Sequence, residues 1–195
     1  MELTVFCDLY QNGIILLEGK RNVIEEDKIK LIAIGKLLAE KMPNAIFRSG
    51  NADGSDYFFS QGVASVNPKQ LQVVTPYTNH RKKYNLAETV YPLDTIDLLN
   101  EPQVIYQSKN HKGTASLVAK YVDGVKNAYT IKGAYIIRDT IKVLGTNSGI
   151  LPISVGMFYE DLSNPMQGGT GHTQRVCLES KIPLLNQETY FSWLE

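Results

Sequence analysis

The chain has 195 residues, of which 20 are basic and 20 acidic, so its formal net charge is zero and its isoelectric point is about 6.8. A content of 43% hydrophobic and 21% charged residues is that of a folded globular protein and excludes long disorder or a fibrous repeat. The balanced charge argues against nucleic acid as the partner, because dedicated nucleic-acid binders usually carry clustered positive charge.

The chain carries no signal for secretion or for the membrane. It begins MELTVFCD, without a basic or a long apolar region, and no stretch approaches about 18 consecutive apolar residues. Cys7 and Cys177 lie far apart and have no partners at metal-ligand spacing, which predicts reduced thiols rather than a disulfide or a zinc site. We therefore expect a cytoplasmic protein that holds no metal.

The first predicted unit is strand, turn and helix. The apolar run 13–17 predicts a strand, and residues 25–41 predict an amphipathic helix with acids crowded into its first turn. Asn22, with Glu25 three residues later, resembles a capping box for this helix.

A second unit of the same kind follows. Residues 45–48 predict a strand, 49–54 a turn and 55–66 a helix. A third strand over 71–75 stops before Pro76, which cannot continue a ladder.

The second half of the chain is less regular. Within 77–127, short helices are expected at 93–99 and 113–122, between polar loops. Residues 131–144 predict a helix because apolar side chains recur near one face, although the isoleucine-rich stretch could also form a strand. The remaining elements are a strand over 153–158, a glycine-rich loop over 168–171, a helix to about Ser180, a strand over 182–185, and a terminal helix over 188–194 that packs Trp193 against the body.

This alternation predicts an α/β protein with a Rossmann-like, doubly wound, mostly parallel sheet and helices on both faces. In such a sheet the carboxyl ends of the strands share one edge, where ligands bind. The loops 18–21, 49–55 and 168–173 all contain glycine and all follow strands, so they are expected to meet at that edge. We expect a single domain over 1–195, with the first 12 residues or so and 77–127 as elaborations.

The loop 49–56 can bind a phosphate or a ribose hydroxyl. Gly50 and Gly54 permit close approaches, and the helix that follows presents free N–H groups. The alternative is ordinary helix chemistry, in which Asp53 or Ser55 caps the helix.

The loop 166–173 has three glycines in four residues followed by hydroxyl side chains, which suits a phosphate cradle. It is neither a P-loop nor a dinucleotide fingerprint, since the glycine spacing differs and the P-loop lysine is missing. His172 either contacts a ligand or lies exposed, and no carboxylate is evident that would orient it as a general base. We expect His111 to be an exposed loop residue.

Tyr77 and Tyr84 flank the basic cluster 80–83. The cluster either binds phosphates or single-stranded nucleic acid by charge and stacking, or forms a solvent-exposed loop surface. Arg138, on the predicted helix 131–144, either reaches the ligand edge or pairs with an acid.

Two glycine-containing segments carry a family resemblance. AIFRSGNADGSDYFFSQGVA, over 45–64, resembles the SGGAxGAD strand, loop and helix of the SLOG superfamily, which joins Smf/DprA DNA-processing proteins with the Lonely-guy (LOG) phosphoribohydrolases. GGTGHTQRVCLESKIPLLNQ, over 168–187, resembles the Gly-Gly-Thr loop, helix and strand of the same superfamily. The resemblance implies a Rossmann-like domain that binds nucleotides or nucleotide-derived molecules between two glycine loops, often as a homodimer, and some members sense ADP-ribose-like signals.

The enzymatic LOG branch carries Pro-Gly-Gly-x-Gly-Thr-x-x-Glu, in which the Glu and an upstream Arg belong to the active site. Here Gly168, Gly169 and Gly171 match, whereas Gln167, His172 and Arg175 stand at the Pro, Thr and Glu positions. A cation in place of the carboxylate cannot stabilise an oxocarbenium-like ribosyl centre, so the resemblance argues against LOG-type glycosidic cleavage.

We therefore expect a ligand-binding protein, a sensor or a sequestering protein, that holds a nucleotide of the ADP-ribose-like or cyclic class and no other cofactor. Its phosphates would bind the amides of 50–55 and 168–173, and Asp53 or Asp56 would accept ribose hydroxyls. Countercharge would come from Lys20, Arg21 and Arg138. The full set of predicted ligand-binding residues is Gly19, Arg21, Ser49, Gly50, Asn51, Asp53, Gly54, Ser55, Asp56, Thr75, Tyr77, Arg138, Gly168, Gly169, Thr170, Gly171, His172 and Thr173.

Two alternatives remain open. An enzyme would use Asp53, Asp56 or His172 to assist N-glycosidic or phosphoester cleavage in the same pocket. A single-strand binder of the DprA type would instead use the basic cluster 80–83 and bind in a strongly salt-dependent way.

Overall fold

The computed structural model describes residues 1–110, 113–125 and 127–195, and they form a six-stranded sheet in the order β4–β3–β2–β1–β5–β6. All neighbouring strands are parallel. The strands are β1 (Ile14–Gly19), β2 (Ile46–Ser49), β3 (Leu71–Thr75), β4 (Thr89–Pro92), β5 (Val155–Tyr159) and β6 (Leu184–Asn186). The predicted Rossmann-like α/β class is confirmed.

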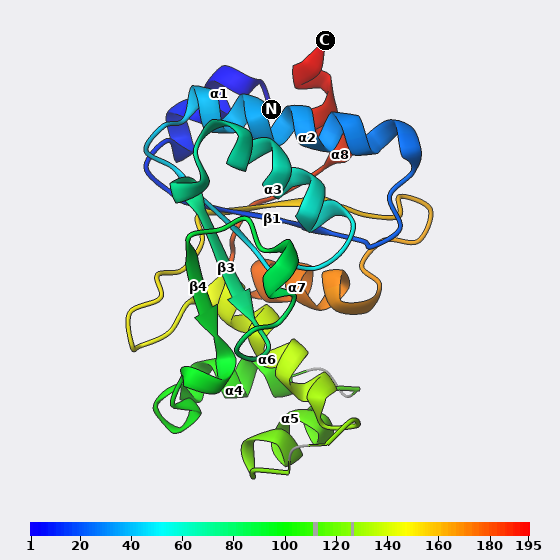
Figure 1. Cartoon of the computed structure of the whole chain (residues 1–195). Coiled ribbons are helices and arrows are strands. Elements are labelled where there is room, and N and C mark those ends of the chain that lie inside the picture. Colours follow the sequence, from blue (N-terminus) through cyan, green and yellow to red (C-terminus); the bar gives the residue numbers. More distant parts are fainter. Residues whose placement is uncertain (111–112, 126) are drawn as a thin grey trace.

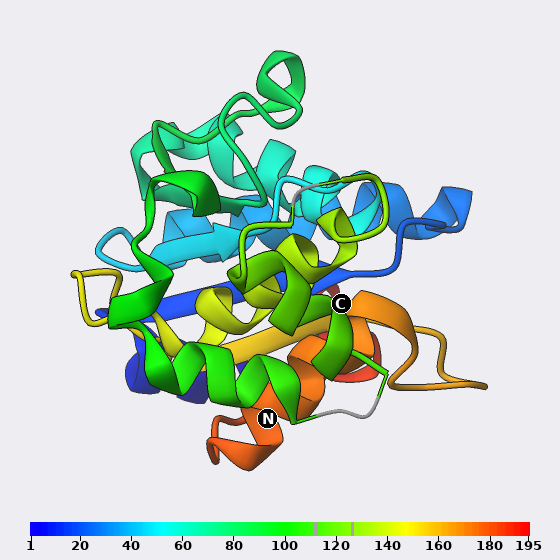
Figure 2. The same ribbon diagram turned by 90° about the horizontal axis from the view of Figure 1, so that it is seen from below.

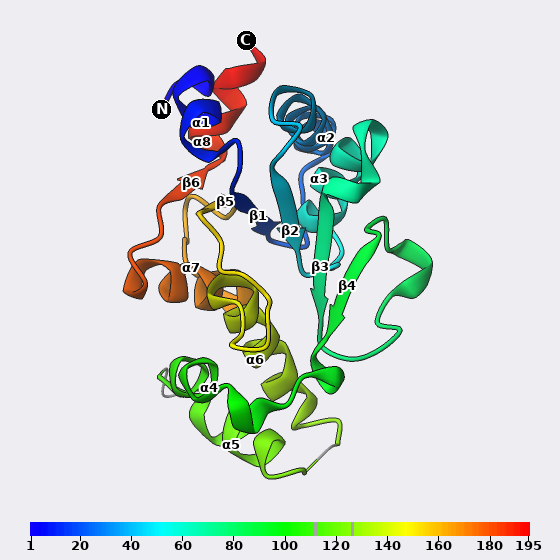
Figure 3. The same ribbon diagram turned by 90° about the vertical axis from the view of Figure 1, so that its left-hand side faces the viewer.

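Helices cover both faces of the sheet, as Figure 3 shows. They are α1 (Leu3–Tyr10), α2 (Glu25–Lys41), α3 (Ser55–Val66), α4 (Pro102–Lys109), α5 (Ala115–Val122), α6 (Ile131–Leu144), α7 (Gly168–Glu179) and α8 (Gln187–Phe191). One face carries α2 and α3, together with α1 and α8, and the other carries α6 and α7. Helices α4 and α5 pack on α6 (Figure 2), and α5 lies at the end of the molecule remote from the two termini (Figure 1).

The central strand β1 is buried along its whole length, and its side chains alternate between two cores. Ile15 and Leu17 belong to the cluster with α2 and α3, whereas Leu16 belongs to the cluster with α6 and α7. By the same alternation Glu18 faces α6 and α7, where it is only 4% exposed. The strand pattern thus buries a carboxylate at the carboxyl edge of the sheet.

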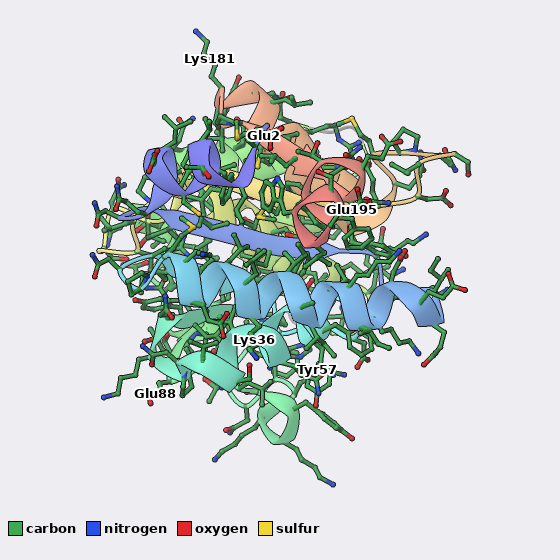
Figure 4. The ribbon with its side chains drawn as sticks, turned by 90° about the horizontal axis from the view of Figure 1, so that it is seen from above. Glu2, Lys36, Tyr57, Glu88, Lys181 and Glu195 are labelled. Carbon is green, nitrogen blue, oxygen red and sulfur yellow. The ribbon has the colours of Figure 1, made fainter. Side chains whose placement is uncertain are left out.

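The two ends of the chain pack against each other beside α2, as Figure 4 shows around the labelled Glu2, Lys36 and Glu195. The Trp193 ring lies 5.0 Å from that of Phe6, and its Nε1 donates a hydrogen bond to the Met1 carbonyl at 2.9 Å. The prediction that Trp193 packs against the body is confirmed.

Helices α2, α3 and α6 follow the predicted bounds, and the strand alternative for 131–144 is wrong. The capping role of Asn22 is also wrong, because the N-cap of α2 is Ile24 and no side chain caps it. The three acidic residues of its first turn compensate the helix dipole instead.

The least accurate predictions concern the middle of the chain. Residues 93–99 form two short 3₁₀ turns rather than a helix, and β4 and α4 were not predicted. Helix α5 confirms the second helical prediction, while the prediction for His111 lies outside the described residues. Residues 168–173 belong to the first turns of α7 and not to a loop.

None of the helices in the described part of the chain is both long and apolar enough to cross a membrane. The described residues also contain no group of three or more side chains that could hold a metal ion.

Candidate functional site

A cavity of about 690 Å³ lies at the carboxyl edge of the sheet, where the strand order reverses between β1 and β5. Its walls come from the end of β1, the loop before α3 and its first turn, the start of α7, and residues of α5 and α6. Open parallel sheets bind ligands at such a reversal point, because the loops on either side of it diverge and leave a crevice.

The start of α7 forms one end of this cavity. Gly168, Gly169 and Thr170 line it, and the first amides of a helix have no acceptor within the helix. The two glycines have no side chains, so a ligand can reach these amides directly. Since the glycines stand at the N-terminal end of α7, the positive end of the helix dipole adds to the amides, and the site suits an anion better than a free loop would.

Charged side chains surround the same space. Among the described residues that line the cavity, five are basic and three are acidic. The basic residues are Lys20, Arg21, Lys132, Arg138 and Lys142, and the acidic ones are Glu18, Asp56 and Asp139. The cavity therefore offers both countercharge for an anion and carboxylates that can accept hydrogen bonds.

The loop between β2 and α3 uses its amides within the protein. The backbone N–H groups of Gly50 and Ala52 donate to Asp56 Oδ2 at 2.9 and 3.4 Å. One carboxylate oxygen thus accepts hydrogen bonds from two amides of the loop, and these two amides are not available to a phosphate.

Two further amides of this segment also donate within the protein. The N–H of Asn51 donates to Ser49 Oγ, and the N–H of Ser55 donates to the Lys20 carbonyl, each at 3.3 Å. The Ser55 hydroxyl donates to that same carbonyl at 3.1 Å. Protein acceptors therefore occupy the amides of 50, 51, 52 and 55, four of those in the predicted phosphate contact with 50–55. Neither Asp53 nor Ser55 caps α3, whose N-cap is Gly54.

Asp56 lines the cavity, and one of its carboxylate oxygens has no hydrogen-bond partner in the described part of the chain. The residue is 1% exposed, and its Oδ1 is buried without a hydrogen-bond partner among the described residues. A buried carboxylate oxygen without a donor is costly, by roughly 1–3 kcal/mol or more. A ligand that presents a hydroxyl or amine here would remove that penalty.

Arg138 of α6 fixes the loop from the other side. Its Nη1 donates to the Gly50 carbonyl at 2.9 Å, and any Cβ at position 50 would collide with the guanidinium. Both sequence alternatives for Arg138 hold, since it lines the cavity and also pairs with Asp139, with Nε 3.2 Å from Oδ1.

A buried ion network forms the floor of the cavity. Lys142 Nζ lies 2.6 Å from Glu18 Oε2 and 2.9 Å from Asp139 Oδ1. The Thr173 hydroxyl donates to Glu18 Oε1 at 3.0 Å. The network therefore ties β1, α6 and α7 together beneath the start of α7.

Burial and mutual charge shift the pKa values of this network in different directions. Burial raises the pKa of Glu18 to about 7, and the neighbouring carboxylates of Asp139 and Asp56 add to the rise while Lys142 opposes it. Burial alone would lower the pKa of Lys142, but Asp139 and Glu18 raise it, so the ammonium stays charged. Burial acts to raise the pKa of Asp139, but Arg138 and Lys142 outweigh it and lower the value.

The structure brings together part of the predicted site. The predicted residues that line the cavity are Gly19, Arg21, Asp56, Arg138, Gly168, Gly169 and Thr170. Those that form its frame without lining it are Ser49, Gly50, Asn51, Gly54, Ser55, Gly171 and Thr173.

Four predicted residues lie elsewhere. Asp53 is exposed and forms an ion pair with Arg81. His172 is buried on another side of α7, where its Nε2 lies 3.0 Å from Thr140 Oγ1. Thr75 donates to the Tyr77 carbonyl at 3.1 Å, and Tyr77 lines a second cavity.

The prediction missed Glu18, Asp139 and Lys142. Glu18 ends an otherwise apolar strand run, and Lys142 lies four residues after Arg138 on the same helix. A helical projection of 131–144 would have put these two cations on one side, but Glu18 on β1, the acidic partner of Lys142, is 124 residues away in the chain.

No family model matches this chain, and no curated protein matches it. Among solved structures, it is similar to the DNA processing protein A of Helicobacter pylori, a structure described for its single-stranded DNA binding mode. The two are 14% identical with a TM-score of 0.49, and the match covers 95% of this chain and 68% of the other.

Proposed function

We propose that this protein binds a small phosphorylated molecule of the nucleotide type in the cavity at the carboxyl edge. The observation that carries the proposal is the combination, in one 690 Å³ cavity, of the glycine-rich start of α7 with five basic side chains. Helix amides and cationic side chains together are what a phosphate group requires. The volume falls within the range of small-molecule sites.

Asp56, in another wall of the cavity, favours a ligand that carries a hydrogen-bond donor in addition to its phosphate. Asp56 Oδ1 offers an unused acceptor, which matches a hydroxyl of a sugar or an amine of a base. The SLOG-like sequences over 45–64 and 168–187 support a nucleotide in preference to other phosphorylated molecules.

The protein acts, in this proposal, as a sensor or a sequestering protein. Arg175, at the position of the LOG carboxylate, donates from Nη1 to the Met166 carbonyl at 3.2 Å and does not line the cavity. The second candidate is an enzyme that cleaves the bound nucleotide. One observation favours it, because Glu18 lines the cavity and its pKa of about 7 suits a general acid.

The basic cluster 80–83 gives less support to a strand-binding role. Arg81 is committed to Asp53 and lies over the Tyr84 ring at 4.9 Å, which leaves Lys82 and Lys83 as the freely exposed cations of the cluster. Binding through such a surface would fall steeply with salt, whereas binding in the cavity would not.

The test is thermal unfolding with a panel of nucleotides, cyclic nucleotides and ADP-ribose, followed by mass spectrometry of each mixture. A ligand that binds only the folded state at 100 times its Kd stabilises by about 2.7 kcal/mol, which is roughly 5 °C or more for a chain of this size. Intact ligand indicates a sensor or a sequestering protein, and new products indicate an enzyme. The absence of any shift would contradict the proposal.

A matched pair of variants locates the site. Gly169→Asp puts a carboxylate at the start of α7, where a Cβ would meet only Asp139 Oδ2 at 3.3 Å and the backbone is not in the left-handed region. Asn164→Asp makes the same charge change on an exposed loop outside the cavity. We expect Gly169→Asp to abolish the thermal shift and Asn164→Asp to retain it. Equal shifts in the two variants would place the ligand elsewhere.

A further inference from the structure

A second cavity, of about 380 Å³, lies beyond the carboxyl end of β3. Its walls include Tyr77, Asp94, Tyr121 and Ile131. Apart from Ile131, these residues come from the middle of the chain, 77–127, which the SLOG-like sequences do not cover. The cavity is therefore a feature of this chain's own elaboration.

The two cavities share their walls along two helices. On α5, Leu117 lines the first cavity and Tyr121, one turn further on, lines the second. On α6, Ile131 lines the second cavity, and Tyr135, one turn further on, lines the first. Residues four apart lie on one side of a helix, so the cavities are neighbours along the same α5–α6 wall.

Close packing of the two helices holds this wall in place. Gly133 of α6 lies directly against the Leu117 carbonyl of α5, and a Cβ at position 133 would come within 2.6 Å of that oxygen. The spacing between the helices therefore depends on a glycine, and a larger residue would push α5 away from both cavities.

Aromatic side chains separate the cavities. Tyr77 lines the second cavity and Tyr135 the first, and burial, with Tyr77 close by, raises the pKa of Tyr135. The His80 ring packs edge-on against both, with centroids 5.0 Å from Tyr77 and 5.7 Å from Tyr135. Burial, with Arg138, Arg81 and Arg21 nearby, lowers the pKa of His80 to about 4, so the imidazole is neutral at pH 7. The His80 ring thus packs between one aromatic ring from the wall of each cavity.

The second cavity has the chemistry of a site for a flat ring. Tyr77 and Tyr121 offer aromatic faces or edges, and Ile131 adds an aliphatic contact. Asp94 supplies a carboxylate whose Oδ1 is already fixed by the Thr78 N–H at 2.8 Å and the Thr78 hydroxyl at 2.9 Å. A planar heterocycle that carries an N–H donor fits both the apolar walls and this acceptor.

We propose that the second cavity holds the heteroaromatic ring of a ligand whose phosphate lies in the first cavity. The ligand is then an extended nucleotide, with its base beside Tyr77 and its phosphate at the start of α7. This inference rests on the proposed function and adds to it the residues that select the base.

Three probes separate the parts of such a ligand. ADP-ribose and AMP each carry a phosphate and a base, whereas ribose 5-phosphate carries a phosphate without a base. Affinities for the wild-type protein, for Tyr77→Leu and for Asp94→Asn are measured by isothermal titration calorimetry. Tyr106→Leu is the matched control, because Tyr106 is 66% exposed on α4 and lines neither cavity.

We expect Tyr77→Leu to weaken the better base-bearing probe about 10-fold, in line with the loss of one base–aromatic contact. We expect Asp94→Asn to weaken it about fivefold, because a carboxylate acceptor becomes a neutral amide. Ribose 5-phosphate should change by less than about twofold in either variant, and Tyr106→Leu should change nothing. Asp94→Asn conserves shape, so it tests the inference even if Tyr77→Leu does not fold.

Three outcomes would overturn the inference. The first is that both variants bind every probe like the wild type, and the second is that they weaken the probes with and without a base equally. The third is that the wild type binds ribose 5-phosphate but neither base-bearing probe, which leaves the proposed function standing and removes the ring subsite. Failure of the whole panel on the wild type would instead remove the proposed function itself.

Discussion

Helices α3 and α7 both begin at the same edge of the sheet, and both have glycines at or just before their first residue, yet the backbone amides near the two helix starts are used differently. In front of α3, Asp56 accepts from the amides of Gly50 and Ala52, and the Lys20 carbonyl accepts from the amide of Ser55, the first helical residue. At the start of α7, two glycines face the cavity, and the helix is anchored one turn later through Thr173 to the buried Glu18. A glycine-rich helix start therefore predicts an anion site only when no side chain of the protein already occupies it.

The largest effect is expected from breaking the network beneath α7. Lys142→Met leaves Glu18 and Asp139 without their shared cation, and we expect a loss of about 3–5 kcal/mol in the free energy of unfolding, measured by urea denaturation. Adding Glu18→Gln should recover part of this loss, because it removes one of the unpaired carboxylates. Additive losses in the double variant would show that the pair does not interact as the structure indicates.

The pH dependence of the free energy of unfolding also tests the buried network beneath α7, through Glu18. The pKa of Glu18 is about 7 in the folded protein and near 4.5 when unfolded, so its protonated form stabilises the fold. This contribution is fully present below pH 4.5 and is lost as the pH rises through about 7, by an amount on the order of 3 kcal/mol. Glu18→Gln should lack this loss.

The measurement must compare Glu18→Gln with the wild type, because His80 acts in the opposite sense. Its pKa is lowered from 6.5 to about 4 in the folded protein, so its contribution is present above pH 6.5 and is lost as the pH falls toward 4. The difference between the two proteins cancels the His80 effect. A difference that does not change between pH 4.5 and 7 would contradict the assignment to Glu18.

At the start of α3, Asp56→Ala should remove the hydrogen bonds that hold the loop between β2 and α3. The variant removes the acceptor for the amides of Gly50 and Ala52 within a buried site, and we expect it to lower the free energy of unfolding by about 2 kcal/mol. Asp56→Asn keeps one acceptor oxygen and should lose less. If Asp56→Ala were as stable as the wild type, the loop would not depend on this carboxylate, and the contrast between the two helix starts would fail.

The smallest effect is expected at the surface of the same loop. Asp53 and Arg81 form an ion pair in which the Asp53 side chain is 65% exposed. Because solvent screens such a pair, Asp53→Ala should change the free energy of unfolding by less than about 1 kcal/mol. A larger loss in urea denaturation would show that Arg81 depends on Asp53 to position the segment around His80.

Local patterns in the sequence were enough to predict most of the sheet and its covering helices. The apolar runs that became β1, β2, β3 and β5 are short and bounded by turn residues, and α6 carries apolar residues at helical spacing. Such signals arise from residues that are near one another in the chain. The missed elements are α1, β4 and α4, each of eight residues or fewer, and such short elements depend on their neighbours for burial.

The candidate site divides in the same way. The sequence by itself determined that Gly168, Gly169 and Asp56 would meet at the carboxyl edge, because parallel topology brings the ends of all strands together. Which loop amides donate within the protein depends on tertiary structure, because it is set by how the Asp56 carboxylate turns and where the Lys20 carbonyl lies. The pairing of Glu18 with Lys142, across 124 residues of chain, likewise exists only when β1 and α6 pack together. Hydrogen bonds and ion pairs act over a few ångströms, so contacts between distant segments are decided by packing and leave little trace in local sequence.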